Sequence, residues 1–319
     1  MIPAVSAATG GGSVKLPYQW VATGISGELY TSTSTTASSW TSRTSSFSTS
    51  RIQWVASNGT SLYVAVGELG KLATSPDGIT WTQQTSSFST SDIYGIAYGS
   101  DGYWVACGDG GKVAYSTNGT SWTQKATGIT GVVTCVAYGN GLWIIGNDSG
   151  SFYTATNPTG TWTSRTSTLT NTTIGCGIHY AKSLAIWIAG CDGGTTGALA
   201  SSTDGLTWTA RDSAFSIGLA GGVGISSNTT VAVAAGIKTI VPAVYDVESS
   251  TNGTTWTDRS PANTTAANNR IACDDSGMFC WIGGNAQTST DGVNWTDRGV
   301  IDSNVKSGIC HSSGTPSIR

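Results

Sequence analysis

One short motif recurs along the chain and constrains its fold more than any other feature. It reads Ser-x-(Asp/Asn)-Gly-x-x-Trp-Thr, and we call it the box. Two degenerate copies accompany five clear ones, and neighbouring box tryptophans lie 39 to 48 residues apart. A period of roughly 40 residues with strand-like content predicts a closed array such as a β-propeller. The seven box tryptophans are Trp40, Trp81, Trp122, Trp162, Trp208, Trp256 and Trp295.

Each repeat is expected to supply four strands. In the unit from Ile93 to Lys125, short runs rich in β-branched and aromatic residues alternate with turns rich in Gly, Asn and Asp. Four such strands make one propeller blade. The box falls between the third and fourth strands, where its Asx-Gly pair tolerates the positive φ of a tight turn. We expect the Ser and Asx side chains to bond free turn amides and the Trp to pack between blades. The Asx residues of the clear boxes are Asp77, Asn118, Asp204, Asn252 and Asp291.

The two ends of the chain complement each other. The first unit opens at Tyr18 with the pattern of a second strand and lacks a first strand. Residues 305–311, after the last box, have the pattern of that missing strand. We therefore predict an all-β fold, a seven-bladed β-propeller over residues 17–319, whose C-terminal strand completes the N-terminal blade and leaves no open edge. Residues 1–16, rich in Ala, Gly and Ser, are expected to form an arm that makes an assembly contact.

From about residue 17 to residue 314, the repeats resemble the Asp-box (BNR) propeller family, which includes sialidases and many non-enzymatic propellers. The chain departs from the family pattern in one respect, because its Asx and Gly are adjacent where the usual box has one residue between Asp and Gly. The resemblance implies the fold. It does not imply a chemistry, since the box is a structural turn away from the family's catalytic centre.

Most of the residues that sialidase-like chemistry requires are absent from the chain. That chemistry needs three arginines around a carboxylate, a Tyr/Glu nucleophilic pair and an acid/base Asp. Five arginines lie three residues after a box Trp, which makes them repeat positions on outer strands: Arg43, Arg165, Arg211, Arg259 and Arg298. Arg51, Arg270 and Arg319 remain, with only three glutamates. We predict that the protein is not an enzyme and has no catalytic residues, and a divergent glycoside hydrolase is the third class considered.

The sequence also lacks a motif for binding a metal or a cofactor. Acidic residues occupy equivalent loops between second and third strands, where a cation is conceivable, but they have no Asp-x-Asp-x-Asp spacing. They are Glu68, Asp109, Asp148 and Asp192. His179 and His311 are placed at equivalent first-strand positions, alongside Tyr98 and Tyr138, which favours packing or channel lining. We predict no metal and no cofactor.

The seven cysteines lie on expected strands. Cys176/Cys191 and Cys273/Cys280 are pairs that could face each other across hairpins. The other interpretation is that they are small buried thiols, and the sequence leaves both open.

Loops of the fifth and sixth units are enlarged, at 192–197 and 237–243, and insertions into a repeat mark the face that interacts. The apolar residues seven positions after the box tryptophans, such as Phe47 and Phe88, are instead expected to plug the space between blades. The predicted binding residues are Ile237, Lys238, Thr239, Ile240, Val241, Asp192 and Thr195.

Composition narrows the class of function. Charged residues make up 10% of the chain and the net charge is -3, which leaves no basic footprint for nucleic acid and no polybasic membrane patch. The sequence shows no signal peptide and no apolar run long enough for a transmembrane helix. With a surface expected to be rich in Ser, Thr and Gly, we predict a virion-associated structural or host-attachment protein of a tailed bacteriophage, assembled in the host cytoplasm. It would be present in multiple copies, contact other virion proteins through the arm, and contact partner subunits or cell-surface glycan through its loops. The alternative is a bacterial lectin or assembly-factor propeller.

Overall fold

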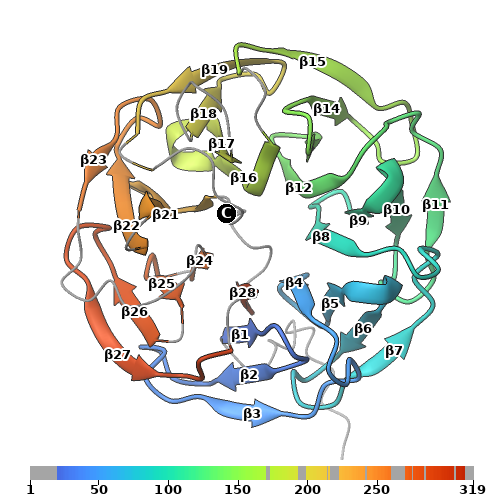
Figure 1. Ribbon diagram of the computed structural model, residues 1–319, viewed down its shortest axis with the longest axis horizontal. Helices are drawn as coiled ribbons and strands as arrows, with labels where there is room; N and C mark the ends of the chain where they lie inside the picture. The colour runs from blue at the N-terminus through green and yellow to red at the C-terminus, as the bar shows by residue number, and fades with distance from the viewer. Residues whose placement is uncertain are drawn as a thin grey trace, which may run out of the picture.

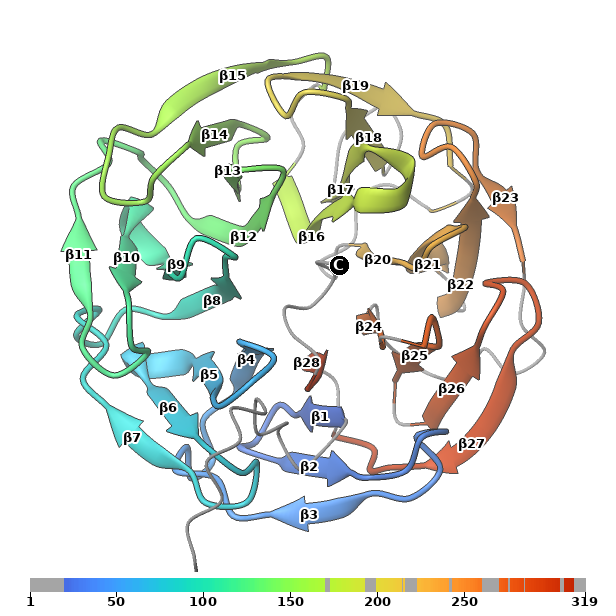
Figure 2. The ribbon, with the colours of Figure 1, turned by 180° about the vertical axis from the view of Figure 1, so that it is seen from behind.

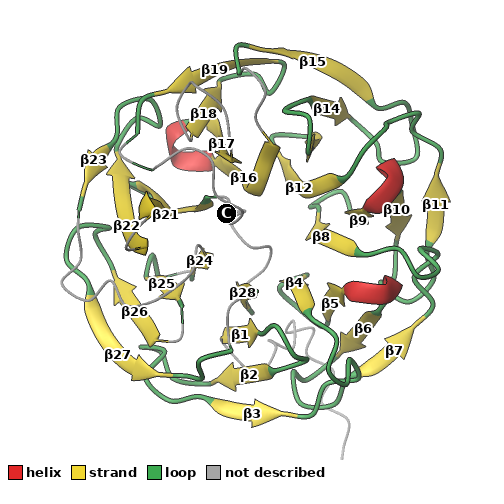
Figure 3. Ribbon diagram, viewed as in Figure 1, coloured by secondary structure: helices red, strands yellow, loops and turns green. Residues whose placement is uncertain are grey.

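The computed structural model of the protein describes residues 20–169, 173–192, 199–213, 215, 223–240, 243–259, 270–274, 276–283, 285–304 and 307–312. For residues 173–176, 192, 237–240 and 243–245 it describes the backbone alone. The predicted arm, residues 1–16, lies outside the described residues. Strands dominate, joined by turns and short 3-10 segments (Figure 3), so the predicted all-β class is confirmed.

The described residues form 28 strands in antiparallel four-stranded units. In chain order, the first unit contains β1 Trp20–Thr23, β2 Leu29–Ser32, β3 Thr41–Arg43 and the C-terminal β28 Gly308–His311. The next two contain β4 Ile52–Ser57, β5 Tyr63–Gly67, β6 Leu72–Ser75 and β7 Thr82–Gln84, then β8 Ile93–Tyr98, β9 Trp104–Gly108, β10 Val113–Ser116 and β11 Thr123–Lys125. Two more contain β12 Val133–Gly139, β13 Leu142–Asn147, β14 Phe152–Ala155 and β15 Thr163–Ser167, then β16 Thr173–Ala181, β17 Ile186–Asp192, β18 Leu199–Ser202 and β19 Thr207–Arg211. The last two contain β20 Gly224–Ser227, β21 Ala232–Ile240, β22 Ala243–Ser250 and β23 Thr257–Asp258, then β24 Arg270–Cys273, β25 Phe279–Ile282, β26 Asn285–Ser289 and β27 Thr296–Val300. The 3-10 segments are Glu68–Gly70, Asp109–Gly111 and Lys182–Leu184.

The units are arranged in a ring around a central axis (Figures 1 and 2). In both views the first strand of each unit, such as β4 or β8, lies nearest the centre, and the fourth, such as β7 or β11, lies at the perimeter. Burial decreases toward the perimeter. The second strands β5 and β9 are buried along their whole length, whereas the fourth strands β7 and β11 are largely exposed. The core therefore lies between neighbouring sheets.

The C-terminal strand completes the first sheet, as predicted. β28 pairs antiparallel with β1, with Trp20 opposite His311 and Thr23 opposite Gly308. Ile309 and Cys310 of β28 are buried. The backbone N–H groups of β1 that a free edge would expose are thereby paired by the other end of the chain.

Two of the four-stranded units are joined into one eight-stranded sheet. Their fourth strands, β15 and β19, pair in parallel through Thr166 with Thr207 and Ser167 with Trp208. Each unit keeps its own antiparallel order, β12-β13-β14-β15 and β16-β17-β18-β19.

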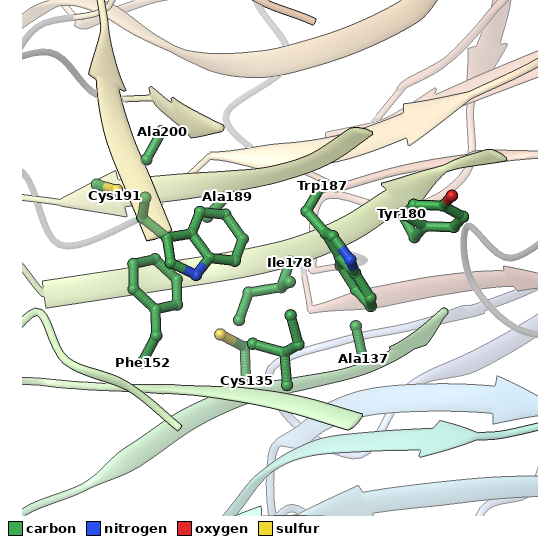
Figure 4. Close-up of a cluster of buried hydrophobic side chains, with 11 residues drawn as sticks. Cys135, Ala137, Phe152, Ile178, Tyr180, Trp187, Ala189, Cys191 and Ala200 are labelled. Atoms are coloured by element: carbon green, nitrogen blue, oxygen red, sulfur yellow. The ribbon is translucent and has the colours of Figure 1, made fainter. Parts of the chain in front are cut away.

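Large side chains fill the space between neighbouring units. Figure 4 shows one such cluster, which contains Phe152, Cys135, Ile178 and Trp187. Within this cluster the ring of Phe152 stacks on the box residue Trp208, with ring centroids 4.0 Å apart and an interplanar angle of 3°. Trp208 belongs to the unit after that of Phe152, so this box Trp packs between units as predicted.

Residues 237–240 and 243 of the predicted 237–243 loop lie in strands, so the loop interpretation is wrong for them, and residues 241–242 lie outside the described residues. β21 and β22 pair as far as Ile240 with Ala243. The β-branched residues of Ile237–Ile240 favour the strand conformation, which explains why the insertion lengthens two strands.

Truncation tests the role of β28. A variant lacking residues 303–319 should lose the inner strand of the first sheet, and we expect its melting temperature to fall by more than about 10 °C, because several kcal/mol of pairing and burial are lost. Circular dichroism during heating measures this. The matched control lacks only residues 313–319 and keeps β28. Equal melting of the long truncation and the full chain would contradict the closure.

Candidate functional site

The box forms a self-bonded turn. In the copy at Ser116, the hydroxyl oxygen accepts the Gly119 N–H at 2.8 Å and donates to the Asn118 side-chain oxygen at 3.0 Å. That oxygen also accepts the N–H groups of Thr120 and Ser121. Gly119 has φ +74°, as predicted for the turn. The serine, Asx and glycine contacts recur in the boxes that start at Ser75, Ser202, Ser250 and Ser289.

The turn also contacts the neighbouring unit. A Cβ added to Gly119 would lie 2.6 Å from the Leu62 side chain, and one added to Gly205 would lie 2.8 Å from Leu142. Glycine is required there by both the positive φ and the close approach. Backbone N–H groups of Thr207 and Leu206 lower the pKa of the Asp204 carboxyl, because they bond its charged form. The box aspartate is therefore a structural acceptor.

The repeat arginines bond within their own sheets. Arg43 Nε donates to Thr31 Oγ1 at 2.8 Å, and Arg298 Nε donates to Thr288 Oγ1 at 2.8 Å. Arg165 and Arg211 make the same contact from the fourth strand to a third-strand hydroxyl, and Arg259 makes it from the position directly after β23. The predicted place on the outer strands is confirmed for the other four arginines, whereas Arg259 lies just beyond its strand.

Two of the four acidic loop residues, Glu68 and Asp109, bond backbone N–H groups. A carboxylate oxygen of Glu68 accepts the Arg51 N–H at 3.0 Å, and one of Asp109 accepts the Asp92 N–H at 3.1 Å. Each bond ties the loop after a second strand to the start of the first strand in the same sheet. Among the described residues, no group of three His, Cys, Asp or Glu side chains could hold a metal.

The predicted equivalence of the two histidines is wrong. His311 lies opposite Trp20, as Tyr98, Tyr138 and Tyr180 lie opposite Trp104, Trp143 and Trp187. His179 instead lies opposite Ile188, one position earlier. The bulge of β16, from Ile174 to Gly177, contains one more residue than the bulge of β8 from Ile93 to Gly95, and this shifts the register.

His179 is buried between two units. Its Nε2 lies 2.6 Å from Ser227 Oγ on β20, and its Nδ1 is buried without a hydrogen-bond partner. Burial lowers the pKa of His179 to about 3. A general base works best with a pKa near the operating pH, so this Ser–His contact is unsuited to acid-base catalysis at neutral pH.

The structure decides one of the two cysteine pairings that the sequence left open. Cys280 is a buried free cysteine, and it lies opposite Ala272, so it forms no disulfide with Cys273. Burial raises the pKa of the Cys280 thiol. The side chain of Cys176 lies outside the described residues, which leaves Cys176/Cys191 untested.

The predicted binding residues also lie outside what is described. This holds for Thr195 and Val241 entirely and for the side chains of Asp192 and Ile237–Ile240. The apolar plugs are described, and Phe47 and Phe88 are buried between units as predicted.

One charged cluster lies at the inner edge of the ring, where β24, β28 and β4 begin. Arg270 Nε donates to the Ser307 carbonyl at 2.5 Å, and Arg51 Nε donates to Ser307 Oγ at 3.1 Å. The Arg270 guanidinium carbon lies 4.9 Å from the ring centroid of Trp54. Sequence reasoning separated these two arginines from the repeat, but it had no signal that they meet at one serine.

Solved structures that resemble this chain are β-propellers. YCF48 bound to a D1 peptide matches at 17% identity with a TM-score of 0.56, covering 90% of this chain and 88% of that chain. The GH74 xyloglucanase of Xanthomonas campestris matches at 12% identity with a TM-score of 0.65, covering 92% of this chain and 55% of that chain. The WD40 β-propeller domain of Doa1 matches at 11% identity with a TM-score of 0.55, covering 93% and 94%. At these identities the likeness shows the fold, and the chain is a β-propeller.

No protein-family model matches the chain, and no curated protein does. Within the part of the chain that the structure describes, no helix has the length and apolarity to cross a bilayer.

Replacing the box serine tests the turn. Ser116→Ala removes an acceptor for the Gly119 and Asn118 N–H groups, and we expect it to lower the free energy of unfolding by about 1–2 kcal/mol. Thr117→Ala, at the exposed neighbouring position, should change it by less than about 0.5 kcal/mol. Urea unfolding measures both, and equal effects would show that the serine hydroxyl has no special role.

The burial of His179 predicts the pH range over which its imidazole stays neutral. We expect its imidazole to stay neutral between pH 5 and pH 8, since its pKa is lowered to about 3. The unfolded chain, with an ordinary pKa of about 6.5, then binds more protons, so this group's contribution to stability falls as the pH drops below about 6.5. Long-range 1H–15N spectra measure the titration, and His179→Gln assigns the signals. Protonation near pH 6.5 would contradict the burial.

Proposed function

We propose that the ring is a seven-bladed propeller with an Asp-box repeat. The eight-stranded sheet counts as two blades, because its halves share only the two parallel pairs between β15 and β19. Each four-stranded unit has one box Trp between its third and fourth strands or at the start of the fourth. Seven boxes and seven such units support this count.

We propose further that the propeller binds partners and is not an enzyme. The observation that carries this proposal is the structural use of its candidate catalytic groups. The repeat arginines bond third-strand hydroxyls, the Glu68 and Asp109 carboxylates bond backbone N–H groups, and burial keeps His179 neutral. Groups held in this way are not available for acid-base or nucleophilic steps.

We propose that the protein binds its partners as part of the particle of a tailed bacteriophage. The low charge, the Ser- and Thr-rich composition and the thiols compatible with assembly in the cytoplasm support this proposal. Residues 1–16 would anchor the ring to other virion proteins, while the 237–243 hairpin and the nearby loops would face a partner or glycan.

An assembly-factor or lectin propeller is the second candidate. The likeness to YCF48, which was solved bound to a D1 peptide, favours a propeller that recognises peptide. The likeness to GH74 xyloglucanase keeps a glycoside hydrolase as a third class.

Mass spectrometry of purified virions tests the preferred function. The chain should be present in intact particles. A variant without residues 1–16 should be absent from them, although its ring melts at the same temperature as the full chain. Absence of the full chain from particles would refute the virion role, and unchanged incorporation of the truncated chain would refute the role of the arm. Turnover of glycosides that is lost in Arg270→Met would refute the non-catalytic assignment.

A further inference from the structure

Arg270 is a buried cation with an unused donor. The residue is 9% exposed, and its Nη1 is buried without a hydrogen-bond partner. Its described contacts are neutral, namely the Ser307 carbonyl and the face of Trp54. A buried guanidinium is costly unless anions or acceptors surround it, so an unpaired N–H at this depth requires an explanation.

Three inner strands bring the cluster together. β28 lies between β24 and β4 in the ring (Figure 1) and begins at Gly308. A Cβ added to Gly308 would lie 3.1 Å from the Cα of Trp54, so β28 and β4 approach closely at this glycine. The side chain of Arg270 passes from β24 across the start of β28 and reaches Trp54 on β4.

A second cation reaches the same serine. Arg51 precedes β4 and donates from its Nε to Ser307 Oγ, while Arg270 donates to the carbonyl of that residue. Two guanidinium groups on one serine concentrate positive charge at this point of the ring. Arg270 Nη1 is the donor of this cluster that an anion can engage.

We propose that this cluster binds a carboxylate group of a protein partner. A carboxylate is planar, carries one charge and matches the parallel N–H groups of a guanidinium. A phosphate carries more negative charge than a carboxylate, so the Glu68 carboxylate, which accepts the Arg51 N–H, repels a phosphate more strongly than it repels a carboxylate. The assignment rests on the proposed partner-binding function and adds the chemistry of the ligand.

N-acetylglycine, which has the carboxylate of a peptide C-terminus, is the probe. It should bind saturably to the full chain in isothermal titration at constant ionic strength, whereas N-acetylglycine amide and inorganic phosphate should bind at least about tenfold more weakly. In 1H–15N spectra of the same protein, the Nε–H signal of Arg270 should shift with the same saturation curve. This second measurement needs no variant.

Substitution supplies the matched control. Arg270→Met should weaken binding of N-acetylglycine by at least about tenfold. Arg211→Met removes a repeat arginine on the outer strand and should leave binding unchanged. Unchanged affinity in a folded Arg270→Met, no shift of the Arg270 signal, or tighter binding of phosphate would each overturn the assignment. Absence of the chain from virions would refute the proposed function but would leave this titration unaffected, so the two failures are distinguishable.

Discussion

The box turn couples the local conformation of each repeat to the packing of its neighbour. Its serine and Asx side chains consume the amides that the third and fourth strands leave unpaired. Its glycine, at positive φ, lets the turn approach the second strand of the preceding unit, as Gly119 approaches Val64. Its Trp then enters the layer between the two units, as Trp208 does beside Phe152. A turn that is satisfied internally can pack against apolar side chains without unpaired polar groups, and the ring depends on this.

Charged groups of the repeat bond within their own structural unit. The repeat arginines, the carboxylates of Glu68 and Asp109, and the box aspartates bond groups of their own unit or its turn. Two arginines outside the repeat positions, Arg51 and Arg270, lie where the repeat is interrupted.

That interruption lies at the junction of the two chain ends. β28 joins β1 there, and the unit it completes is flanked by β24 and β4. Arg270 and Arg51 belong to these flanking strands and to the loop before them, and neither occupies a repeat position. Closure of the ring and formation of the arginine cluster thus depend on the same strand, because Ser307 lies directly before β28.

The repeat, the four-stranded unit, the box turn and the pairing of the chain ends could all be predicted from the sequence, because each depends on spacing or on contacts within a few residues. Tertiary structure decided features that depend on register and on long-range approach. One extra residue in the bulge of β16 separated His179 from the position of His311. Strand pairing extended β21 to Ile240 and began β22 at Ala243, where a loop was expected, and parallel pairing joined β15 to β19. Arg51, Arg270 and Ser307 meet only because the closed ring brings together residues from both ends of the chain, and no local pattern encodes that contact.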